Sequence, residues 1–259
     1  MQGQRSKMMN SLVSIIMPVY NSEEFLEDSV SSVMSQSYKN WELLMINDCS
    51  SDSSQEIINR FTQLDSRIHS FSTSERSGSP MIPRNLGISK SKGRYICFLD
   101  SDDIWLPEKL QHQLDCFSAN PDAPLVYSDY EKIRVDGKRN GRLLKMPKQV
   151  NYKKLLAGNV IGCSTAIYDT AKLGKCLFPS CGHEDYELWL SILRTGGFAY
   201  NTGYVDALYR VRKDSVSANK FWTSRWQWTI YRQYEKLSFI DSLYYFCRYA
   251  YHAIMKSLI

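Results

Sequence analysis

The first hundred residues alternate short apolar runs with segments of helical periodicity. Runs rich in β-branched and aromatic residues at 12–19, 41–46, 68–72 and 95–99 predict four strands. Apolar residues at helical spacing predict the intervening helices, the first with a capped start at residues 22–25. The apolar helical positions are Phe25, Leu26, Val30 and Val33 in the first helix, and Ile57, Ile58, Phe61 and Leu64 in the second, while residues 84–88 are expected to open the third.

Strands that alternate with helices over short connections favour parallel pairing. We therefore expect an α/β fold, with a Rossmann-like and mostly parallel central sheet flanked by helices. No Gly-x-Gly-x-x-Gly follows the first strand, which argues against a dinucleotide site. No Gly-x-x-x-x-Gly-Lys-Ser/Thr occurs either. The first half is typical of a nucleotide-binding unit that lacks both of these phosphate-cradling motifs.

The second half has a less regular periodicity. Residues 125–135 predict a strand that turns back as a hairpin at Asp136 and Gly137. Residues 160–168 form another apolar segment, and residues 183–190 predict an acidic loop that enters an amphipathic helix. We find no internal repeat or low-complexity linker.

The fourth apolar run ends in three carboxylates within four residues, Asp100, Asp102 and Asp103. In open α/β sheets, ligands bind at the carboxyl ends of the strands. Hard oxygen ligands there suit Mg²⁺ or Mn²⁺ and, through the metal, a substrate's phosphates. The alternative is that Asp102 or Asp103 caps the helix predicted from Pro107. A cap needs one such residue and three are present, so a metal and phosphate site is favoured.

Length and composition indicate how large a core the chain can bury and which redox compartment suits it. A chain of 259 residues, 43% hydrophobic and 23% charged, can bury one full α/β core and carry a smaller appendage. Its seven cysteines are an odd number without a C-x-x-C pair, which favours a reducing compartment over a disulfide framework. Cys176 and Cys181 lie near His183, but no fourth partner at a recognised spacing completes a metal site.

The two ends of the chain differ from its middle. Residues 1–11 are polar and lack an apolar signal core, which predicts a short disordered lead. The sequence has no run of 18 apolar residues that would predict a membrane span. The net charge of +5 is uneven, since from residue 210 onward nine Lys/Arg stand against three Asp/Glu. The basic character therefore belongs to the tail.

Four polar clusters stand at the ends of predicted strands or the starts of predicted helices. Their order and spacing over about residues 13–217 resemble the family 2 inverting glycosyltransferases, which have the GT-A fold. The resemblance implies a catalytic domain at 12–217, with a nucleotide-binding half (12–105) and an acceptor half (106–217). The segments that carry it are Ser14-Ile15-Ile16-Met17-Pro18-Val19-Tyr20-Asn21, Asn47-Asp48-Cys49-Ser50-Ser51-Asp52, Arg84-Asn85-Leu86-Gly87, Leu99-Asp100-Ser101-Asp102-Asp103 and Glu184-Asp185-Tyr186-Glu187-Leu188-Trp189.

The resemblance assigns the diphosphate end of the donor to acids and arginines. It gives Asp102 to the metal and diphosphate, and Asp100 to the ribose or metal region. Arg84 would contact the diphosphate or the uracil, although a surface or ion-paired arginine fits the sequence equally well. Arg210 and Arg212 lie in a segment that, in this family, often closes over the diphosphate, and guanidinium groups suit phosphate geometry.

The resemblance also implies a pocket for the nucleobase. Asp48 would accept a hydrogen bond from a uracil N–H. Pro18 and Asn21 would belong to a loop that passes beside the base, with Tyr20 as a stacking surface. The residues alone leave alternatives open, since Asp48 and Asp52 also fit a turn and a helix cap and Tyr20 also fits packing.

Inversion needs a base that takes the proton of the acceptor hydroxyl. The family pattern gives this role to Asp185, with Glu184 orienting the acceptor or the base. The alternatives are a capping acid for Asp185, and either loop packing or an additional contact for His183. One departure from the usual pattern is that Asn47 and Cys49 stand where Asp and Gly are common, and Cys49 places a side chain in a tight turn.

Residues 218–259 predict a C-terminal amphipathic helical tail rich in aromatic and basic residues. Such a stripe suits an anionic membrane interface, or packing on the catalytic domain or on a second copy. A lipid-linked acceptor favours the membrane, nucleic acid is disfavoured, and an oligomer stays open. The last helix is expected to present Ile240, Leu243, Cys247, Ala250, Ile254 and Leu258 on one side, and Asp241, Tyr245, Arg248, His252 and Lys256 on the other.

Together these expectations describe a metal-dependent, inverting transferase that uses Mn²⁺ or Mg²⁺. It would move a hexose or N-acetylhexosamine from a UDP-sugar to a lipid-linked glycan in bacterial surface polysaccharide (O-antigen or capsule) synthesis. We expect it in the cytoplasm, peripheral on the inner face of the plasma membrane. Two alternatives stay open, a sugar-nucleotide pyrophosphorylase, which usually has a glycine-rich basic loop after the first strand, and a non-catalytic UDP-binding membrane scaffold.

Overall fold

The computed structural model describes residues 10–211 and 220–258, with the backbone alone for 220–222 and 252–258. Among these residues, ten strands join in one sheet of order β3-β2-β1-β4-β9-β6-β10-β5, with β7 paired to β6 and β8 to β10. The strands are β1 (Val13–Val19), β2 (Trp41–Asn47), β3 (Ile68–Ser72), β4 (Tyr95–Phe98), β5 (Ile104–Trp105), β6 (Leu125–Ile133), β7 (Arg139–Leu144), β8 (Gln149–Val150), β9 (Ile167–Asp169) and β10 (Ala199–Arg210).

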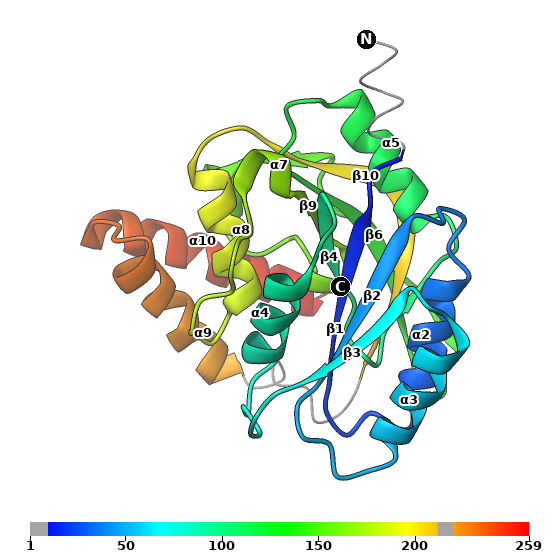
Figure 1. Ribbon diagram of the computed structural model, residues 1–259. Helices are drawn as coiled ribbons and strands as arrows, with labels where there is room; N and C mark the ends of the chain where they lie inside the picture. Colours follow the sequence, from blue (N-terminus) through cyan, green and yellow to red (C-terminus); the bar gives the residue numbers. More distant parts are fainter. Residues whose placement is uncertain (1–9, 212–219, 259) are drawn as a thin grey trace.

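Helices cover both faces of this sheet (Figure 1). Helices α2, α3 and α5 pack on one face, and α4, α6 and α8 pack on the other. The helices are α2 (Leu26–Met34), α3 (Ser54–Leu64), α4 (Met81–Lys90), α5 (Lys109–Ala119), α6 (Tyr152–Leu155), α7 (Thr170–Leu173), α8 (Glu184–Arg194), α9 (Lys220–Thr229) and α10 (Phe239–Leu258), with a 3₁₀ turn η1 (Cys163–Thr165) and a π-helical turn η3 (Ile230–Tyr234).

The four strands predicted in the first half form the parallel part of the sheet. Strand β1 pairs in parallel with β2 and β4, and β2 pairs in parallel with β3. The chain therefore reverses its direction of travel across the sheet at β1, which leaves a crevice at the carboxyl ends of β1 and β4. Ligands of open α/β sheets bind at such a switch point. The predicted α/β fold is confirmed, and the acidic segment after β4 lies at this crevice.

The second half extends the sheet with mixed pairing. Strand β9 pairs antiparallel with both β4 and β6, and β10 runs parallel to β6. The predicted hairpin joins β6 to β7, with Gly137 at a φ of +77° that favours glycine. On the predicted amphipathic helix α8, Leu188, Ile192 and Leu193 are buried against the sheet. This packing fixes the start of α8 beside the crevice.

The start of the first helix differs from its prediction. Helix α2 begins at Leu26, and the residue before it, Phe25, makes no side-chain cap. The Ser22 hydroxyl contacts the Tyr20 carbonyl and the Ser101 hydroxyl (Oγ–Oγ 2.7 Å) instead. Ser22 therefore links the loop after β1 to the acidic loop after β4.

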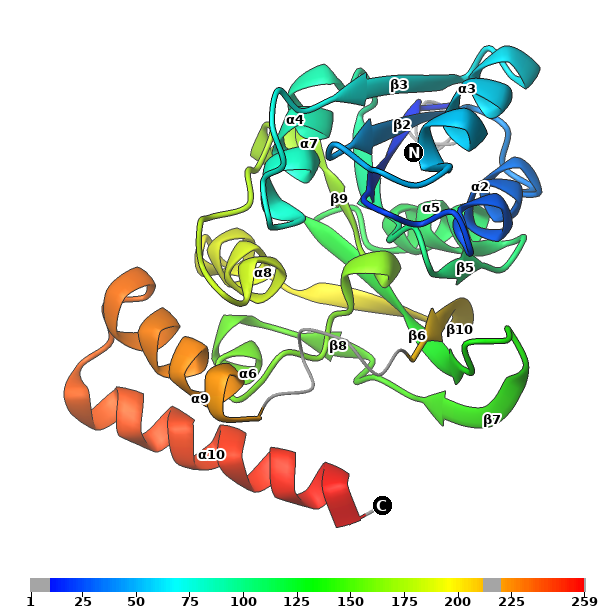
Figure 2. The ribbon, with the colours of Figure 1, turned by 90° about the horizontal axis from the view of Figure 1, so that it is seen from below.

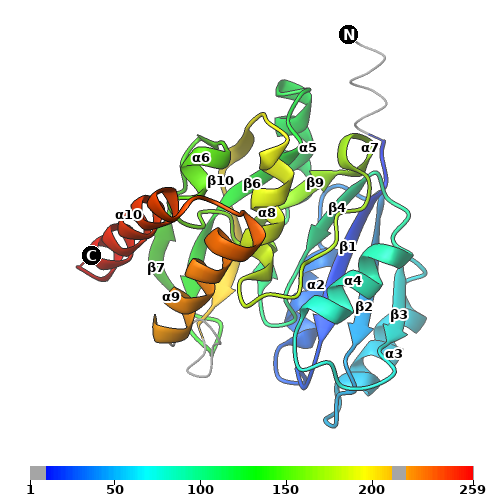
Figure 3. The same ribbon diagram turned by 90° about the vertical axis from the view of Figure 1, so that its left-hand side faces the viewer.

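The beginning of the tail is part of the hydrophobic core. Helices α9 and α10 lie side by side outside α8 (Figures 2 and 3). Ile230 and Tyr231 are fully buried in the same cluster as α8. On α8, Arg194 forms an ion pair of 2.7 Å with Glu235, which follows η3. Residues 230–235 are therefore held against the helix that begins at Glu184.

Helix α10 packs on the protein with the side that carries Tyr245 and Phe246 and, among residues 239–251, leaves most of the predicted apolar side exposed. Tyr245 and Phe246 contact the core cluster. In contrast, Ile240 and Leu243 are 78% and 48% exposed, and Cys247 is exposed. Tyr245 was expected among the polar residues, but its ring lies near that of Tyr231 (centroids 6.3 Å apart) and packs on the protein. In the part of the chain that the structure describes, no helix is long and apolar enough to cross a bilayer.

Candidate active site

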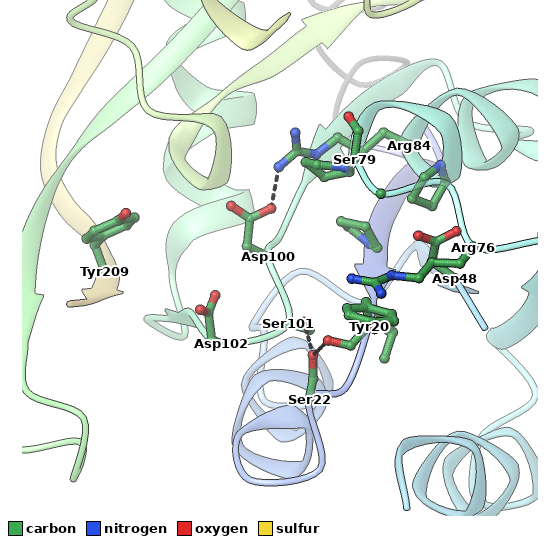
Figure 4. Close-up of a pocket in the computed structure, with 15 residues that line it drawn as sticks. Tyr20, Ser22, Asp48, Arg76, Ser79, Arg84, Asp100, Ser101, Asp102 and Tyr209 are labelled. Carbon is green, nitrogen blue, oxygen red and sulfur yellow. Dashed lines mark hydrogen bonds and ion pairs between the residues drawn. The ribbon is translucent and has the colours of Figure 1, made fainter. Parts of the chain in front are cut away.

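A cavity of about 320 Å³ opens at the carboxyl ends of β1, β2 and β4 (Figure 4). The loops after the three strands supply much of its wall, and α4 with the loop before it supplies much of the rest. Tyr20 and Asp48 gather toward one end in Figure 4, and Asp102 lies toward the other. The predicted site residues that line it are Pro18, Tyr20, Asp48, Arg84, Asp100 and Asp102.

The loops after β1 and β2 brace each other. Asn21 adopts a φ of +45°, and its Oδ1 accepts a hydrogen bond of 2.8 Å from the Ser51 N–H. Asn21 is thus a support of this loop and does not line the cavity. Cys49 adopts a φ of +58°, a left-handed conformation that costs a non-glycine residue about 1–2 kcal/mol. Glycine, which the resemblance led us to expect at this position, would adopt this conformation without that cost.

Asp48 is buried and holds the loop between β3 and α4. Its carboxylate accepts hydrogen bonds from Thr73 Oγ1 (2.8 Å), Ser77 Oγ (2.7 Å) and the Ser77 N–H (3.0 Å). In the same region, the Arg76 guanidinium lies 4.4 Å from the centre of the Tyr20 ring. The place predicted for a nucleobase is thus bordered by an aromatic ring, a cation and a carboxylate.

Asp52, at the end of the same cluster, supports the turn before α3, whose N-cap residue is Ser53. Its Oδ1 accepts a hydrogen bond of 3.0 Å from the N–H of Ser54, the first residue of α3. Its Oδ2 accepts another of 3.0 Å from the Glu23 N–H, which ties the loop to the start of the first helical region.

The acidic loop after β4 places its three carboxylates differently. Asp103 is buried, and its oxygens accept hydrogen bonds from Ser164 Oγ (2.6 Å) and the Arg210 N–H (3.0 Å). Burial, and next the charges of Asp100 and Asp102, raise the pKa of Asp103. Asp102 is half-buried at the cavity wall. The capping alternative is wrong, because α5 begins at Lys109 and is preceded by Glu108.

Arg84 links this loop to the second pair of acids. Its side chain is 5% exposed and forms ion pairs with Asp100 (2.6 Å) and Glu184 (3.2 Å). A buried cation depends on its carboxylate partners, because removing one partner leaves a desolvated charge that is only partly compensated. Among the described residues, its Nε is buried without a hydrogen-bond partner. Arg84 is therefore ion-paired, and it also lines the cavity.

A second cavity, of about 300 Å³, lies on the far side of Arg84 and is lined by Glu184, Asp185, Cys163 and Tyr130. Burial raises the pKa of both Glu184 and Asp185, while the charge of Arg84 lowers it in part. A carboxylate with a raised pKa is a better proton acceptor near neutral pH. The pair also begins α8, where the helix dipole favours negative charge.

Asp185 is oriented by two hydrogen bonds. Its Oδ1 accepts from the Tyr186 N–H (2.7 Å) and its Oδ2 from the Asn159 amide (3.2 Å). The first bond satisfies the Tyr186 N–H at the start of α8. Asp185 therefore has a capping role there, as the alternative expected. Its place in the wall of the second cavity leaves the carboxylate available to a ligand there.

Of the two arginines predicted to close over the diphosphate, the structure describes Arg210 only. The guanidinium of Arg210 is buried and donates to the backbone carbonyls of Asp102 (2.8 Å) and Val135 (2.5 Å). We correct the expectation for Arg210, because its guanidinium supports the acidic loop from behind and is absent from the cavity wall. Arg212 lies outside the described residues.

Several lining residues carry no signal in the sequence. Tyr209 lies near the end of β10 and lines both cavities, and Ser164 and Cys163 come from the 3₁₀ turn η1. These residues reach the site only through the mixed pairing of the second half, which periodicity does not predict. Arg76 could have been noticed as a basic residue in the loop after the third predicted strand.

Asp100 and Asp102 are suited to a metal ion that a substrate's phosphates also bind. The described residues contain no group of three or more His, Cys, Asp or Glu that could hold a metal ion by itself. Mg²⁺ is usually bound through one or two carboxylates together with substrate phosphates. Asp102, half-buried beside Asp100 at the wall of an open cavity, matches that arrangement.

Comparison with known proteins agrees with this geometry. The family model described as Glycosyl transferase family 2 matches residues 14–170. The chain is 34% identical over 248 residues to TuaG of Bacillus subtilis (strain 168), named for teichuronic acid biosynthesis, covering 95% of this chain and 98% of that one. It is 38% identical over 246 residues to the Escherichia coli protein WfgD, a UDP-Glc:alpha-D-GlcNAc-diphosphoundecaprenol beta-1,3-glucosyltransferase, covering 95% and 94%.

Solved structures show the same fold. The structure of S. aureus TarS 1–349 in complex with UDP-GlcNAc superposes with a TM-score of 0.70 at 18% identity, covering 92% of this chain and 71% of that one. The fold is therefore the GT-A fold that the sequence predicts. With the family model and two full-length relatives in agreement, the chain belongs to glycosyltransferase family 2.

Proposed function

We propose that this glycosyltransferase moves a hexose or N-acetylhexosamine, with inversion, from a UDP-sugar to a glycan on a lipid diphosphate during surface polysaccharide synthesis. The relatives named above support the class of donor and acceptor. The observation that carries the proposal is the chain of ion pairs Asp100–Arg84–Glu184. In these pairs one buried cation joins Asp100, which we assign to the diphosphate side, to Glu184, the neighbour of the proposed base.

On the donor side, UDP would occupy the cavity at the ends of β1, β2 and β4. The uracil would lie near Asp48 and Tyr20, and the diphosphate near Asp100 and Asp102. Mg²⁺ or Mn²⁺ held by Asp102 would neutralise charge that develops on the departing diphosphate. The Arg84 guanidinium, which lines this cavity, would add positive charge near the diphosphate.

On the acceptor side, the transferred sugar would lie in the second cavity, between the diphosphate and Asp185. A bond forms from the acceptor oxygen to the anomeric carbon while the bond from that carbon to the diphosphate oxygen breaks. UDP leaves with the electron pair, and Asp185 takes the proton of the acceptor hydroxyl. Attack from the face opposite to UDP inverts the configuration.

Release of UDP tests this proposal. A panel of UDP-sugars is incubated with the enzyme and membranes that contain lipid-linked glycans, with Mn²⁺ or with EDTA. We expect release from one donor, dependent on the metal and on the acceptor. UDP binding without turnover of any donor would favour a non-catalytic scaffold. Formation of pyrophosphate from a nucleoside triphosphate would reveal a pyrophosphorylase.

We also propose that the enzyme works at the cytoplasmic surface of a membrane, bound through α10. Support comes from the exposed apolar side chains of this helix, since an amphipathic helix with aromatic residues and nearby basic residues suits a lipid interface. Arg248 is exposed on the same helix. The exposed apolar side chains are Phe239, Ile240, Leu243, Tyr244 and Tyr251.

Vesicle flotation separates this membrane proposal from packing on a partner copy. We expect wild-type protein to float with vesicles that contain phosphatidylglycerol, and Ile240→Asp with Leu243→Asp to stay at the bottom. Leu64→Asp is a matched control, because Leu64 is 67% exposed on α3, away from the tail. Equal flotation of the double variant and the wild type would contradict the proposal.

A further inference from the structure

A third hollow, of about 650 Å³, lies beside the two cavities of the active site. Its walls are the loop that enters α4, the loop that enters α8, and Trp226 of α9. It shares Ser79 and Pro80 with the first cavity, at the ends of β1, β2 and β4, and Glu184 with the second cavity. The three hollows therefore adjoin one another around the Arg84–Glu184 ion pair.

Trp226 forms a fixed aromatic wall of this third hollow. A Cβ atom at Gly182 would lie 2.1–2.3 Å from atoms of the indole, so only glycine lets the ring lie so close to the loop. The His183 ring contacts the indole edge-on, with centroids 5.4 Å apart. The Tyr234 hydroxyl also donates to the Ser180 carbonyl at 2.6 Å. The tail thus holds an aromatic ring against the loop that leads directly into Glu184 and Asp185.

The hollow also offers polar groups. His183 lines the hollow, and within the described part of the chain its Nε2 is buried without a hydrogen-bond partner. Burial lowers the pKa of His183, so the ring is neutral near pH 7 and can accept or donate. Glu184 adds a carboxylate at the inner end. An aromatic wall with a few polar groups is typical of a ligand site.

The position of the hollow selects the ligand. In the proposed function, the donor nucleotide takes the first cavity and the transferred sugar takes the second. An acceptor must bring a hydroxyl to Asp185 from outside both, and the third hollow meets the catalytic pair at Glu184. Its aromatic wall also belongs to the segment that continues into α10, the helix with the exposed apolar face. A sugar joined through a diphosphate to a lipid would span these two features.

We propose that Trp226, the Ser180–His183 loop and Glu184 form the subsite for the acceptor's sugar, with its ring packed on the indole. This inference builds on the proposed function and names a specificity determinant for its acceptor. The tail then has two parts, since α9 contributes to the substrate site and α10 contacts the lipid surface. Deleting the tail from residue 218 would remove both, so single substitutions are needed.

Direct binding tests the subsite without catalysis. The probe is N-acetylglucosaminyl diphosphate on a short alkyl chain, titrated by calorimetry in the presence of UDP and without vesicles. We expect Trp226→Ala to bind the probe about tenfold more weakly and Trp226→Phe to recover most of the affinity. Trp228→Ala is the control, because Trp228 packs on Phe239 and Phe246 and does not line the hollow.

Two outcomes would overturn the inference. One is probe binding by Trp226→Ala that equals the wild type or the Trp228→Ala control, and the other is absence of binding by the wild type. Affinity for UDP should be unchanged in all variants, and its loss in Trp226→Ala would indicate a structural role only. Turnover of UDP-sugars by the wild type is measured separately. Failure there, with Trp226-dependent probe binding intact, would count against the proposed function and leave the subsite standing.

Discussion

The two acidic clusters that flank Arg84 are built in different ways. In the loop after β4, the buried member, Asp103, is held by Ser164 and Arg210, and Asp102 is left half-buried at the cavity wall. At the start of α8, Glu184 and Asp185 are both half-buried, and burial raises the pKa of each. The first arrangement suits holding a cation and a diphosphate, and the second suits taking up a proton.

The comparison shows that burial and partners, more than residue type, divide the work among aspartates. Asp102 and Asp103 are neighbours in the chain, yet Asp103 is tied to the backbone of β10 while Asp102 lines the cavity. Arg84 connects the clusters and lowers the pKa on the Glu184–Asp185 side. Changing each group in turn should therefore give distinct kinetic and thermodynamic signatures.

The largest effect is expected for Asp185→Asn. An amide cannot take the acceptor proton, so kcat should fall by about 10³-fold, within the range for general-base catalysis. The UDP dissociation constant should stay near the wild-type value, because Asp185 lines the second cavity and not the first. Steady-state kinetics and calorimetry check both numbers. Near-normal kcat would remove Asp185 from its role.

Asp102→Asn should have the next largest effect. Losing one carboxylate at the diphosphate should lower kcat/KM for the donor by about 10²-fold, as for loss of one electrostatic contact in a transition state. It should also weaken UDP binding in Mn²⁺ more than in EDTA. A variant whose UDP affinity keeps the wild-type metal dependence would contradict the metal role of Asp102.

Arg84→Gln should move the pH profile. Arg84 lowers the pKa of Asp185, so its removal raises that pKa further, and more of the base is protonated at a given pH. The acid limb of kcat should shift to higher pH, and the variant should lose about 3–5 kcal/mol of stability from the broken buried pair. Arg84→Lys keeps the charge, so the acid limb of its kcat–pH profile should stay near that of the wild type. A shift of the acid limb of Arg84→Gln to lower pH would contradict the role of Asp185 as the base.

The smallest effect is expected for Asp103→Asn, and it concerns stability. The raised pKa of Asp103 means that the folded state binds its proton more tightly than the unfolded state does. The free energy of unfolding of the wild type should therefore fall as pH rises above about 3.9 toward the raised pKa. The Asn variant should lack this contribution. Parallel pH–stability curves for the two proteins would show that the buried carboxylate does not cause the fall in the free energy of unfolding.

Much of the structure of residues 12–105 could be predicted from the sequence. Strands such as β3 and the loops that follow β1, β2 and β4 are encoded locally, by β-branched runs and polar stops. Parallel pairing then brings Asp48 and Asp100 to one edge of the sheet. The details at Ser22 and Arg210 could not be predicted, because each binds partners that only the folded chain brings near.

The part of the chain after residue 105 was harder to predict. The helix that begins at Glu184 is visible in the sequence, but Tyr209 and Cys163 reach the cavity through mixed strand pairing and a 3₁₀ turn. In α10, helical periodicity separates two faces without saying which one packs. The face with Tyr245 and Phe246 packs on the core, and Ile240 is left exposed.

One measurement tests the division between the two clusters most directly. It measures the UDP affinity of Asp102→Asn and Asp185→Asn by calorimetry, in Mn²⁺ and in EDTA. The turnover of both variants is measured in parallel. We predict that Asp102→Asn loses the metal-dependent part of UDP binding, and that Asp185→Asn keeps all of it while losing turnover. Loss of metal-dependent UDP binding in Asp185→Asn, or its retention in Asp102→Asn, would contradict the proposed separation of leaving-group and base roles.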